Sequence, residues 1–165
     1  MGEVRRAIRE RRSVRQFGTE PVERSVVEEI LEAGRWAPSG KNTQPWRFVV
    51  IQSDGVRAGL AKLAPQAGMI ATAPVTIAVL LDRDLGYDDL KDVQGIGAAI
   101  QNVLLAAHDL GLGACWMGKT RDPAIEALIG AQGAEELMAL IPIGRPSGRP
   151  KAPERHDIDR LARFV

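Results

Sequence analysis

The sequence has little of several features that would indicate a function directly. It contains one cysteine, Cys115, so it can form no disulfide within the chain, and a reducing compartment is expected. Its two histidines and that cysteine form no cluster with metal-ligand spacing, which argues against a metal centre. The sequence also lacks a Gly-x-Gly-x-x-Gly turn after a strand, so we expect no separate dinucleotide-binding cleft. We likewise expect no P-loop.

An excess of one charge is also missing. Twenty-two basic and 21 acidic side chains give a formal net charge of +1, so bulk electrostatics predicts neither a nucleic-acid nor a membrane partner. No apolar run approaches the roughly 20 residues of a membrane span, and the N-terminus is charged from Glu3. We expect a cytoplasmic protein. Its 165 residues, 45% of them hydrophobic, fit a single domain over residues 1–165.

The charges are nevertheless distributed unevenly along the chain. Residues 5–15 hold the arginines Arg5, Arg6, Arg9, Arg11, Arg12 and Arg15 against the single acid Glu10. The stretch 82–92 is instead dominated by aspartates. Because the basic cluster is short and local, it fits a small anion better than a polymer.

Hydrophobic periodicity predicts alternating helices and strands without a repeat. Helical spacing marks a short N-terminal helix that ends near Arg11, and further helices at 23–36, 54–63 and 92–110 and after Asp122-Pro123. Apolar strands are predicted at 46–51, 75–81 and 137–143, with a short strand or turn at 113–118. Residues 75–81 are almost unbrokenly apolar, so both faces of that strand should be covered. The proline-containing tail from Gly144 should be extended until its 158–165 ending.

Two polar segments carry most of the chemistry. In 11–15, Arg11, Ser13 and Arg15 occupy alternate positions, so an extended segment points them to one side, as a phosphate dianion requires. Segment 37–46 gathers amide and hydroxyl side chains before a strand. Neither segment alone indicates a binding site. Arginines at helix ends are commonly solvated surface residues, and Ser, Asn and Gly favour loops whatever the loop binds. Together they suggest a phosphorylated, hydrogen-bonding cofactor.

Four segments follow one another along most of the chain. They are 11–17 (Arg-Arg-Ser-Val-Arg-Gln-Phe), 37–50 (beginning Ala-Pro-Ser-Gly-Lys-Asn-Thr-Gln-Pro-Trp), 97–107 (Gly-Ala-Ala-Ile-Gln-Asn-Val-Leu-Leu-Ala-Ala) and 111–118 (Gly-Leu-Gly-Ala-Cys-Trp-Met-Gly). In this order they resemble the successive motifs of the FMN-dependent nitroreductase family. The resemblance implies a nitroreductase-like α+β fold with a central, mostly antiparallel sheet flanked by helices. It also implies a homodimer with FMN at the interface and C-terminal segments that wrap the partner subunit.

The resemblance assigns candidate flavin contacts residue by residue. The set from one subunit, around the phosphate, ribityl chain and ring, is Arg11, Arg12, Ser13, Arg15, Cys115 and Trp116, with Arg155 or Lys151 closing on the phosphate. The set from the other subunit is Pro38, Ser39, Gly40 and Asn42, with Gln44 as a polar support. Backbone N–H groups of Met117 and Gly118 would reach N5 and O4, and Gln66 is the nearest candidate for the N1–O2 edge.

The activity implied by the resemblance is that of an NAD(P)H oxidoreductase. NADH or NADPH would reduce FMN, and a nitroaromatic, quinone or similar electron-poor acceptor would oxidise it in a second, ping-pong half-reaction. No catalytic side chain is assigned, and His108 and Cys115 are interpreted as packed residues. Two alternatives remain open. One keeps the fold and FMN but oxidises or dehalogenates a specific metabolite; the other is a non-enzymatic dimer that binds an anionic ligand or nucleic acid through residues 5–15.

Overall fold

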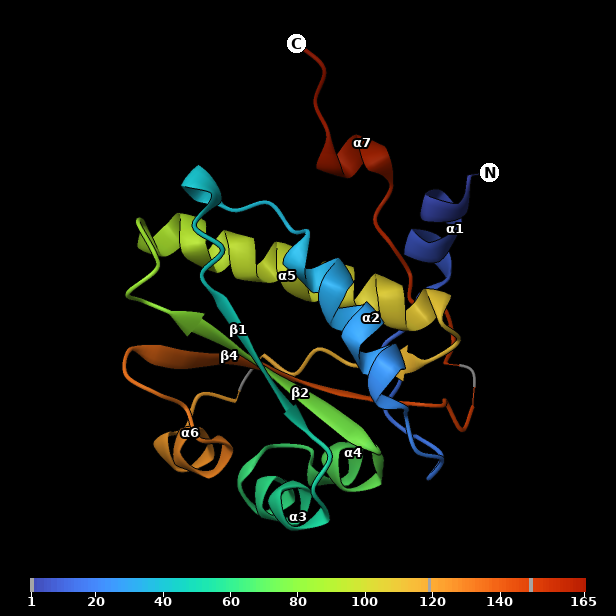
Figure 1. Cartoon of the computed structure of the whole chain (residues 1–165). Helices are drawn as coiled ribbons and strands as arrows, with labels where there is room; N and C mark the ends of the chain where they lie inside the picture. The colour runs from blue at the N-terminus through green and yellow to red at the C-terminus, as the bar shows by residue number, and fades with distance from the viewer. Residues whose placement is uncertain (1, 119, 149) are drawn as a thin grey trace.

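The centre of the protein is a four-stranded sheet, seen in a computed structural model that describes residues 2–118, 120–148 and 150–165 (Figure 1). Its strands are β1 (Trp46–Ile51), β2 (Val75–Asp82), β3 (Gly113–Ala114) and β4 (Glu135–Gly144). They lie in the order β1-β2-β4-β3, and each pairing is antiparallel. The predicted α+β class with a mostly antiparallel sheet is confirmed.

Strand β2 is buried on both faces, as its apolar sequence predicts. Its first seven residues are buried, and it pairs with β1 on one side and β4 on the other. Ile77 lies opposite Ile141 in the register with β4, and a shift in register follows Val79. Because side chains alternate along a strand, β2 contributes to two separate hydrophobic clusters, one on each face of the sheet.

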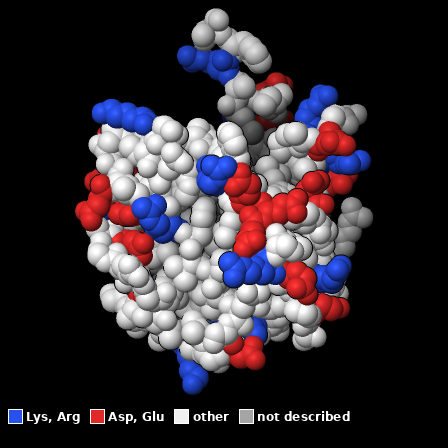
Figure 2. Space-filling view, in the orientation of Figure 1, with Lys and Arg blue, Asp and Glu red and all other residues white. Residues whose placement is uncertain are grey.

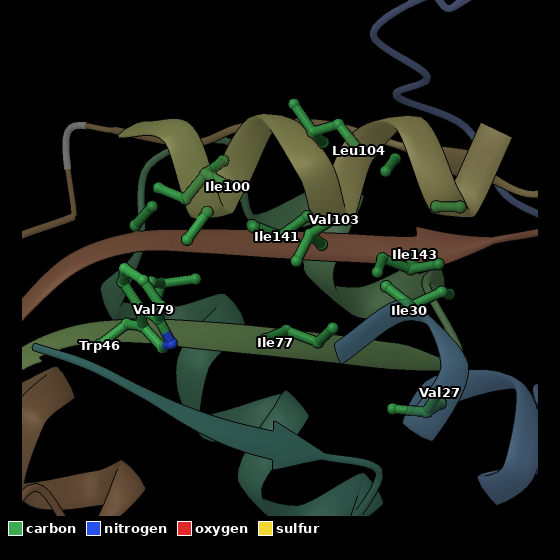
Figure 3. Packing of buried hydrophobic residues seen from close by; sticks show 14 of the residues in the cluster. Val27, Ile30, Trp46, Ile77, Val79, Ile100, Val103, Leu104, Ile141 and Ile143 are labelled. Atoms are coloured by element: carbon green, nitrogen blue, oxygen red, sulfur yellow. The ribbon is translucent and has the colours of Figure 1, made fainter. Parts of the chain in front are cut away.

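Helices α2 (Arg24–Arg35) and α5 (Asp89–Asp109) cover one face of the sheet (Figure 1). Figure 3 shows Ile77 and Val79 of β2 beneath α5, with Ile30 of α2 beside them. Gly34 on α2 permits the close approach of the two helices, since a Cβ there would lie 2.9 Å from a methyl group of Val103. The 21-residue α5 is therefore held along its length by the sheet and by α2.

Helices α3 (Asp54–Leu63), α4 (Ala67–Thr72) and α6 (Pro123–Ile129) cover the opposite face (Figure 1). Their fully buried side chains include Leu60, Ile70 and Ile125, which pack with Leu80 of β2. The segments around Val14 and Cys115 join the same cluster. This face thus anchors two of the chain segments that carry predicted flavin contacts, 11–15 and 115–118.

Both ends of the chain stand away from this body. Helix α1 (Glu3–Glu10) has no buried residue, and α7 (Ile158–Leu161) lies on an extended tail that projects from the sheet layers (Figure 1). The tail exposes large apolar side chains, with Ile158 66% and Phe164 91% exposed. Its wrapping around a partner subunit stays a prediction.

Some boundaries differ from those expected. No helix or strand is predicted from the sequence at 64–73, yet α4 forms there directly after Gln66, which has a left-handed backbone with a φ of 62°. Helix α5 begins at Asp89 rather than 92, because the side chain of Asp88 caps it by accepting from the Lys91 amide at 2.9 Å. The tail helix is only four residues long. Within the described ranges, no helix combines the length and hydropathy needed to cross a bilayer.

Candidate functional site

Residues 11–15 leave α1 and run extended along the edge of the sheet. The Val14 amide donates to the Ala114 carbonyl at 3.0 Å, and Ser13 forms a parallel bridge with Ala114. Val14 is 6% exposed and packs into the core, so its neighbours Ser13 and Arg15 turn to the other side. The alternation predicted from the sequence is therefore present, and burial of Val14 fixes it.

A small cavity of about 170 Å³ lies beside this segment, and basic side chains dominate its lining. The lining residues are Arg11, Arg12, Ser13, Arg15, Pro150, Lys151, Pro153 and Arg155. No acidic residue is among them, and the ion pairs found in the described part of the chain use none of its five cations. The fold thus brings the tail cations Lys151 and Arg155 to the predicted phosphate-binding segment.

Arg11 is the cation most closely enclosed by this cavity. Its Nε is buried and has no hydrogen-bond partner among the described residues. Burial, followed by repulsion from Arg155 and Arg12, lowers the pKa of the Arg11 guanidinium. A cluster of cations around an unsatisfied donor fits a dianion such as a phosphate monoester, which would supply both acceptors and charge.

Arg12 has a second task. One nitrogen of its guanidinium donates to the carbonyls of Arg9 at 2.6 Å and Arg11 at 2.9 Å, at the end of α1. A cation there is favoured by the helix dipole and satisfies the terminal carbonyls. Arg12 therefore stabilises the helix end as well as lining the cavity.

Arg15 connects the cationic cavity to two further hollows. A cavity of about 310 Å³ is lined by Ser13, Arg15 and Pro150 among others, and one of about 500 Å³ by Arg15, Gln66 and Met69 among others. Arg15 lines all three, so the concave surface extends from the cations to the Gln66 amide. The structure thus places Gln66 with Arg15, at the end away from Arg11 and Arg155.

Residues 115–118 lie beside this surface. Cys115 is 4% exposed, and burial raises the pKa of its thiol, against the smaller opposing effects of Arg15 and Arg11. The Met117 amide donates to the Leu140 carbonyl at 3.0 Å. That amide is therefore bonded to β4 in this structure, and the flavin contact expected for Met117 stays a prediction. Gly118, the next residue after Met117, is exposed.

Trp116 flanks the same strip of chain. It is 43% exposed, and its ring lies against α5, where a Cβ at Gly97 would be 3.7 Å from it. Position 97 thus lies at van der Waals distance from the indole. Trp116 is a wall of the surface formed by residues 115–118 rather than a core residue.

The loop that contains the other predicted contacts is strained. It includes the 3-10 turn η1 (Gly40–Asn42), and Lys41, Asn42 and Gln44 all have positive φ, at 50°, 57° and 51°. Each such residue costs on the order of 1 kcal/mol unless its surroundings hold it. The backbone amide of Gln44 donates to Ser39 Oγ at 2.9 Å and closes the loop. Strain of this kind is typical of functional sites.

This loop and the cationic cavity lie near opposite ends of α5. Gly95 approaches the loop, since a Cβ there would be 3.6 Å from the Pro38 carbonyl, whereas His108 shares a cavity with Arg12. At about 1.5 Å per residue, the helix separates Gly95 from His108 by about 20 Å. Figure 1 shows η1 near the start of α5 and α1 near its end. Within one chain, Pro38, Ser39, Gly40, Asn42 and Gln44 are therefore not brought to the cations.

An apolar surface lies on the outer side of the C-terminal half of α5. A cavity of about 440 Å³ is lined by Val4, Trp36 and Leu105 among others, and Val4 and Trp36 are 71% and 73% exposed. Trp36 is held in place: its Nε1 donates to Glu32 at 2.7 Å and the Arg35 guanidinium lies 5.2 Å from its ring. Val4 and Trp36 thus form part of an exposed apolar surface on this side of the molecule.

Charge on the rest of the surface is mixed. Figure 2 shows acidic and basic side chains interspersed over one face, with much of that face uncharged. Among the described residues, no group of three or more His, Cys, Asp or Glu is placed to hold a metal ion. The cationic cavity is thus a local feature, as the sequence predicts.

Comparison with known proteins agrees with these observations. The model of the Nitroreductase family matches residues 8–145, which contain each of the four motif segments, and the chain belongs to that family. The chain is 33% identical over 163 residues to a protein of Methanothermobacter thermautotrophicus, covering 96% of this chain and 85% of the relative. The provisional name of that relative pairs NADH dehydrogenase with NAD(P)H nitroreductase.

Solved structures show the same fold. A nitroreductase-type protein of Desulfovibrio desulfuricans, crystallised in complex with FMN, superposes with a TM-score of 0.93 at 40% identity, covering 100% of this chain and 98% of that one. The NADPH:FMN oxidoreductase of Vibrio harveyi, complexed with NAD+, shares the fold alone, with a TM-score of 0.89 at 22% identity and 77% of its length covered. The nitroreductase-like fold predicted from the motifs is confirmed.

Proposed function

We propose that the protein is an FMN-dependent oxidoreductase that takes reducing equivalents from NADH or NADPH. The observation that carries the proposal is the cavity of about 170 Å³ whose cations, Arg11 above all, lack a counter-charge among the described residues. Its fit to a phosphate monoester, its continuity with the Gln66 amide and the FMN complex of the Desulfovibrio relative all favour FMN as the ligand.

We propose further that the binding site is completed by a second copy of the chain. The strained loop at 38–44 lies about 20 Å from the cations along α5 and reaches no cofactor bound there within its own subunit. A dimer formed through the apolar surface around Trp36 would bury large side chains and bring the partner's loop to the cavity. The exposed apolar residues of the tail, such as Ile158 and Phe164, would then be covered by the partner.

In this proposal the chain binds and orients, and the cofactor carries the chemistry. FMN, when bound, supplies hydride transfer from a nicotinamide to an electron-poor acceptor such as a nitroaromatic or quinone. Arg11, Arg155 and Lys151 would hold the phosphate, and Arg15 and Gln66 would face the polar edge of the ring. The neutral, buried thiol of Cys115 takes no part in redox chemistry.

The test combines binding with assembly. Stoichiometric FMN binding that quenches flavin fluorescence, in a particle with twice the mass of one chain, would support the proposal. NADH- or NADPH-dependent reduction of a quinone and a nitroaromatic should follow, with parallel-line double-reciprocal plots for two half-reactions. A monomer that binds inorganic phosphate and not FMN would reject it. Turnover of none of these acceptors, with FMN bound and reducible, would favour a reaction on a specific metabolite instead.

A further inference from the structure

Tyr87 packs against the strained loop from outside. An added Cβ at Gly40 would overlap the edge of the Tyr87 ring between Cε1 and the hydroxyl, so the glycine is what lets the ring lie there. From the same loop, the Lys41 ammonium lies 4.8 Å from the centre of the ring. Tyr87 thus contacts two successive residues of η1, one by packing and one by a cation–π interaction.

The turn that carries Tyr87 is held by a buried carboxylate. Asp92 is 3% exposed, and its Oδ2 accepts from the backbone amides of Tyr87 at 3.0 Å and Asp88 at 3.1 Å. Asp88 in return caps α5 by accepting from the Lys91 amide. Gly86 completes the turn, because a Cβ there would overlap the Asp92 carboxylate. The backbone position of Tyr87 is therefore fixed by α5 and not by the loop.

The loop needs an outside support of this kind. Lys41 has a φ of 50°, and its chain of four methylenes offers nothing that favours the left-handed region. Helix α5 supports the start of the loop, where Pro38 and Ser39 lie against Gly95, and Ser39 Oγ accepts from the backbone amide of Gln44. In the middle of the loop the Gly40 carbonyl accepts from the Thr43 amide at 3.1 Å, and the Tyr87 ring packs on Gly40 and Lys41. Removing the ring would release this segment towards ordinary backbone conformations.

We infer that Tyr87 is a positioning residue for flavin binding: by clamping Gly40 and Lys41, it holds the 38–44 loop in the conformation that contacts FMN. The inference rests on the proposed function, in which this loop lines the flavin. Tyr87 itself is 44% exposed and is assigned no contact with the cofactor. Its effect passes through the loop, so it should change FMN affinity more than it changes stability.

The chain offers a specific probe, because Tyr87 is its only tyrosine. Protein labelled with 3-fluorotyrosine should therefore give one ¹⁹F resonance from the ring itself. Titration of FMN into the labelled, flavin-free protein should shift or sharpen that resonance in a saturable way. Lys41→Ala should shift the resonance of the flavin-free protein, because the cation above the ring is lost.

Variants test the clamp itself. Tyr87→Ala should weaken FMN binding about tenfold or more, the size expected for loss of an aromatic contact together with a cation–π contact. Tyr87→Phe keeps the ring and should restore affinity to within about twofold of wild type. Leu90→Ala is the matched control, since Leu90 lies on the first turn of α5 and is 64% exposed; it should leave FMN affinity unchanged.

A double-mutant cycle separates the clamp from direct effects at Gly40. In the wild-type background, where the Tyr87 ring is present, Gly40→Ala should weaken FMN binding. In the Tyr87→Ala background, adding Gly40→Ala should weaken FMN binding by less than about twofold. Equal costs in both backgrounds would show that Gly40 acts without Tyr87. That result, an unmoved ¹⁹F resonance at FMN saturation, or Tyr87→Ala with wild-type affinity would each overturn the inference. Failure of the unmodified protein to bind FMN would reject the proposed function instead.

Discussion

Replacing Arg11 by methionine should make the flavin-free protein more stable and the flavin complex weaker. Methionine keeps the length and apolar stem of arginine and removes the charge. Without a ligand, Arg11 is a partly buried guanidinium that faces the like charges of Arg155 and Arg12. Because water still reaches part of the site, screening limits the gain to about 0.5–1 kcal/mol. In a chain of this size that raises the unfolding midpoint by about 1–4 °C.

The same substitution removes a charged hydrogen bond to the phosphate. Such bonds contribute about 2–3 kcal/mol when partly desolvated, so FMN affinity should fall about 30- to 150-fold. Fluorescence titration with FMN gives the affinity, and thermal unfolding of the flavin-free protein gives the stability. Arg5→Met is the control, because Arg5 carries the same charge in the same basic cluster and lies outside the cavity lining. A lower midpoint for flavin-free Arg11→Met, or unchanged FMN affinity, would refute the reasoning.

Three further predictions concern assembly, pH and the thiol. Trp36→Glu should shift the protein towards monomers in sedimentation experiments, since it places a charge on the exposed apolar surface; an unchanged mass would place the interface elsewhere. Arg83 holds the pKa of the Glu136 carboxyl below its usual value, so the stability from this pair is present above the ordinary carboxyl pKa and is lost as the pH falls through the lowered pKa. Arg83→Met should therefore cost about 0.5–1 kcal/mol of stability at pH 7 and progressively less as the pH is lowered through the acid range, measured by urea unfolding. Cys115, buried with a raised pKa, should react with iodoacetamide at pH 8 at least about tenfold more slowly than in the unfolded chain.

Strands and long helices were predictable because their burial is written in the sequence as periodicity. The apolar run at 75–81 became the two-sided strand β2, and the helical pattern after residue 92 became α5. Helix α4 was missed because its six residues carry too short a pattern, and its start depends on the left-handed backbone of Gln66. Short elements that depend on a single backbone conformation carry no periodic signal.

The candidate site was predictable as a set of residues and not as a geometry. Alternation in the sequence was enough to place Ser13 and Arg15 on one side, because Val14 between them is apolar and seeks the core. No local sequence pattern shows that the Met117 amide donates to the Leu140 carbonyl, because that hydrogen bond joins segments far apart in the sequence. The contact of Tyr87 with Gly40 escaped for the same reason. From the sequence alone, a glycine in a polar loop such as Gly40 indicates only a turn. The structure shows that the space at Gly40 is occupied by the Tyr87 ring.

The most direct test of a flavin oxidoreductase is an absorption spectrum of the purified protein after incubation with FMN and removal of the excess. We expect a protein-bound band near ~450 nm that bleaches when NADH or NADPH is added without oxygen and returns when a quinone or a nitroaromatic is supplied. A colourless protein after this treatment, with its cations still able to bind inorganic phosphate, would rule out a flavin oxidoreductase and leave an anion-binding protein with the nitroreductase fold.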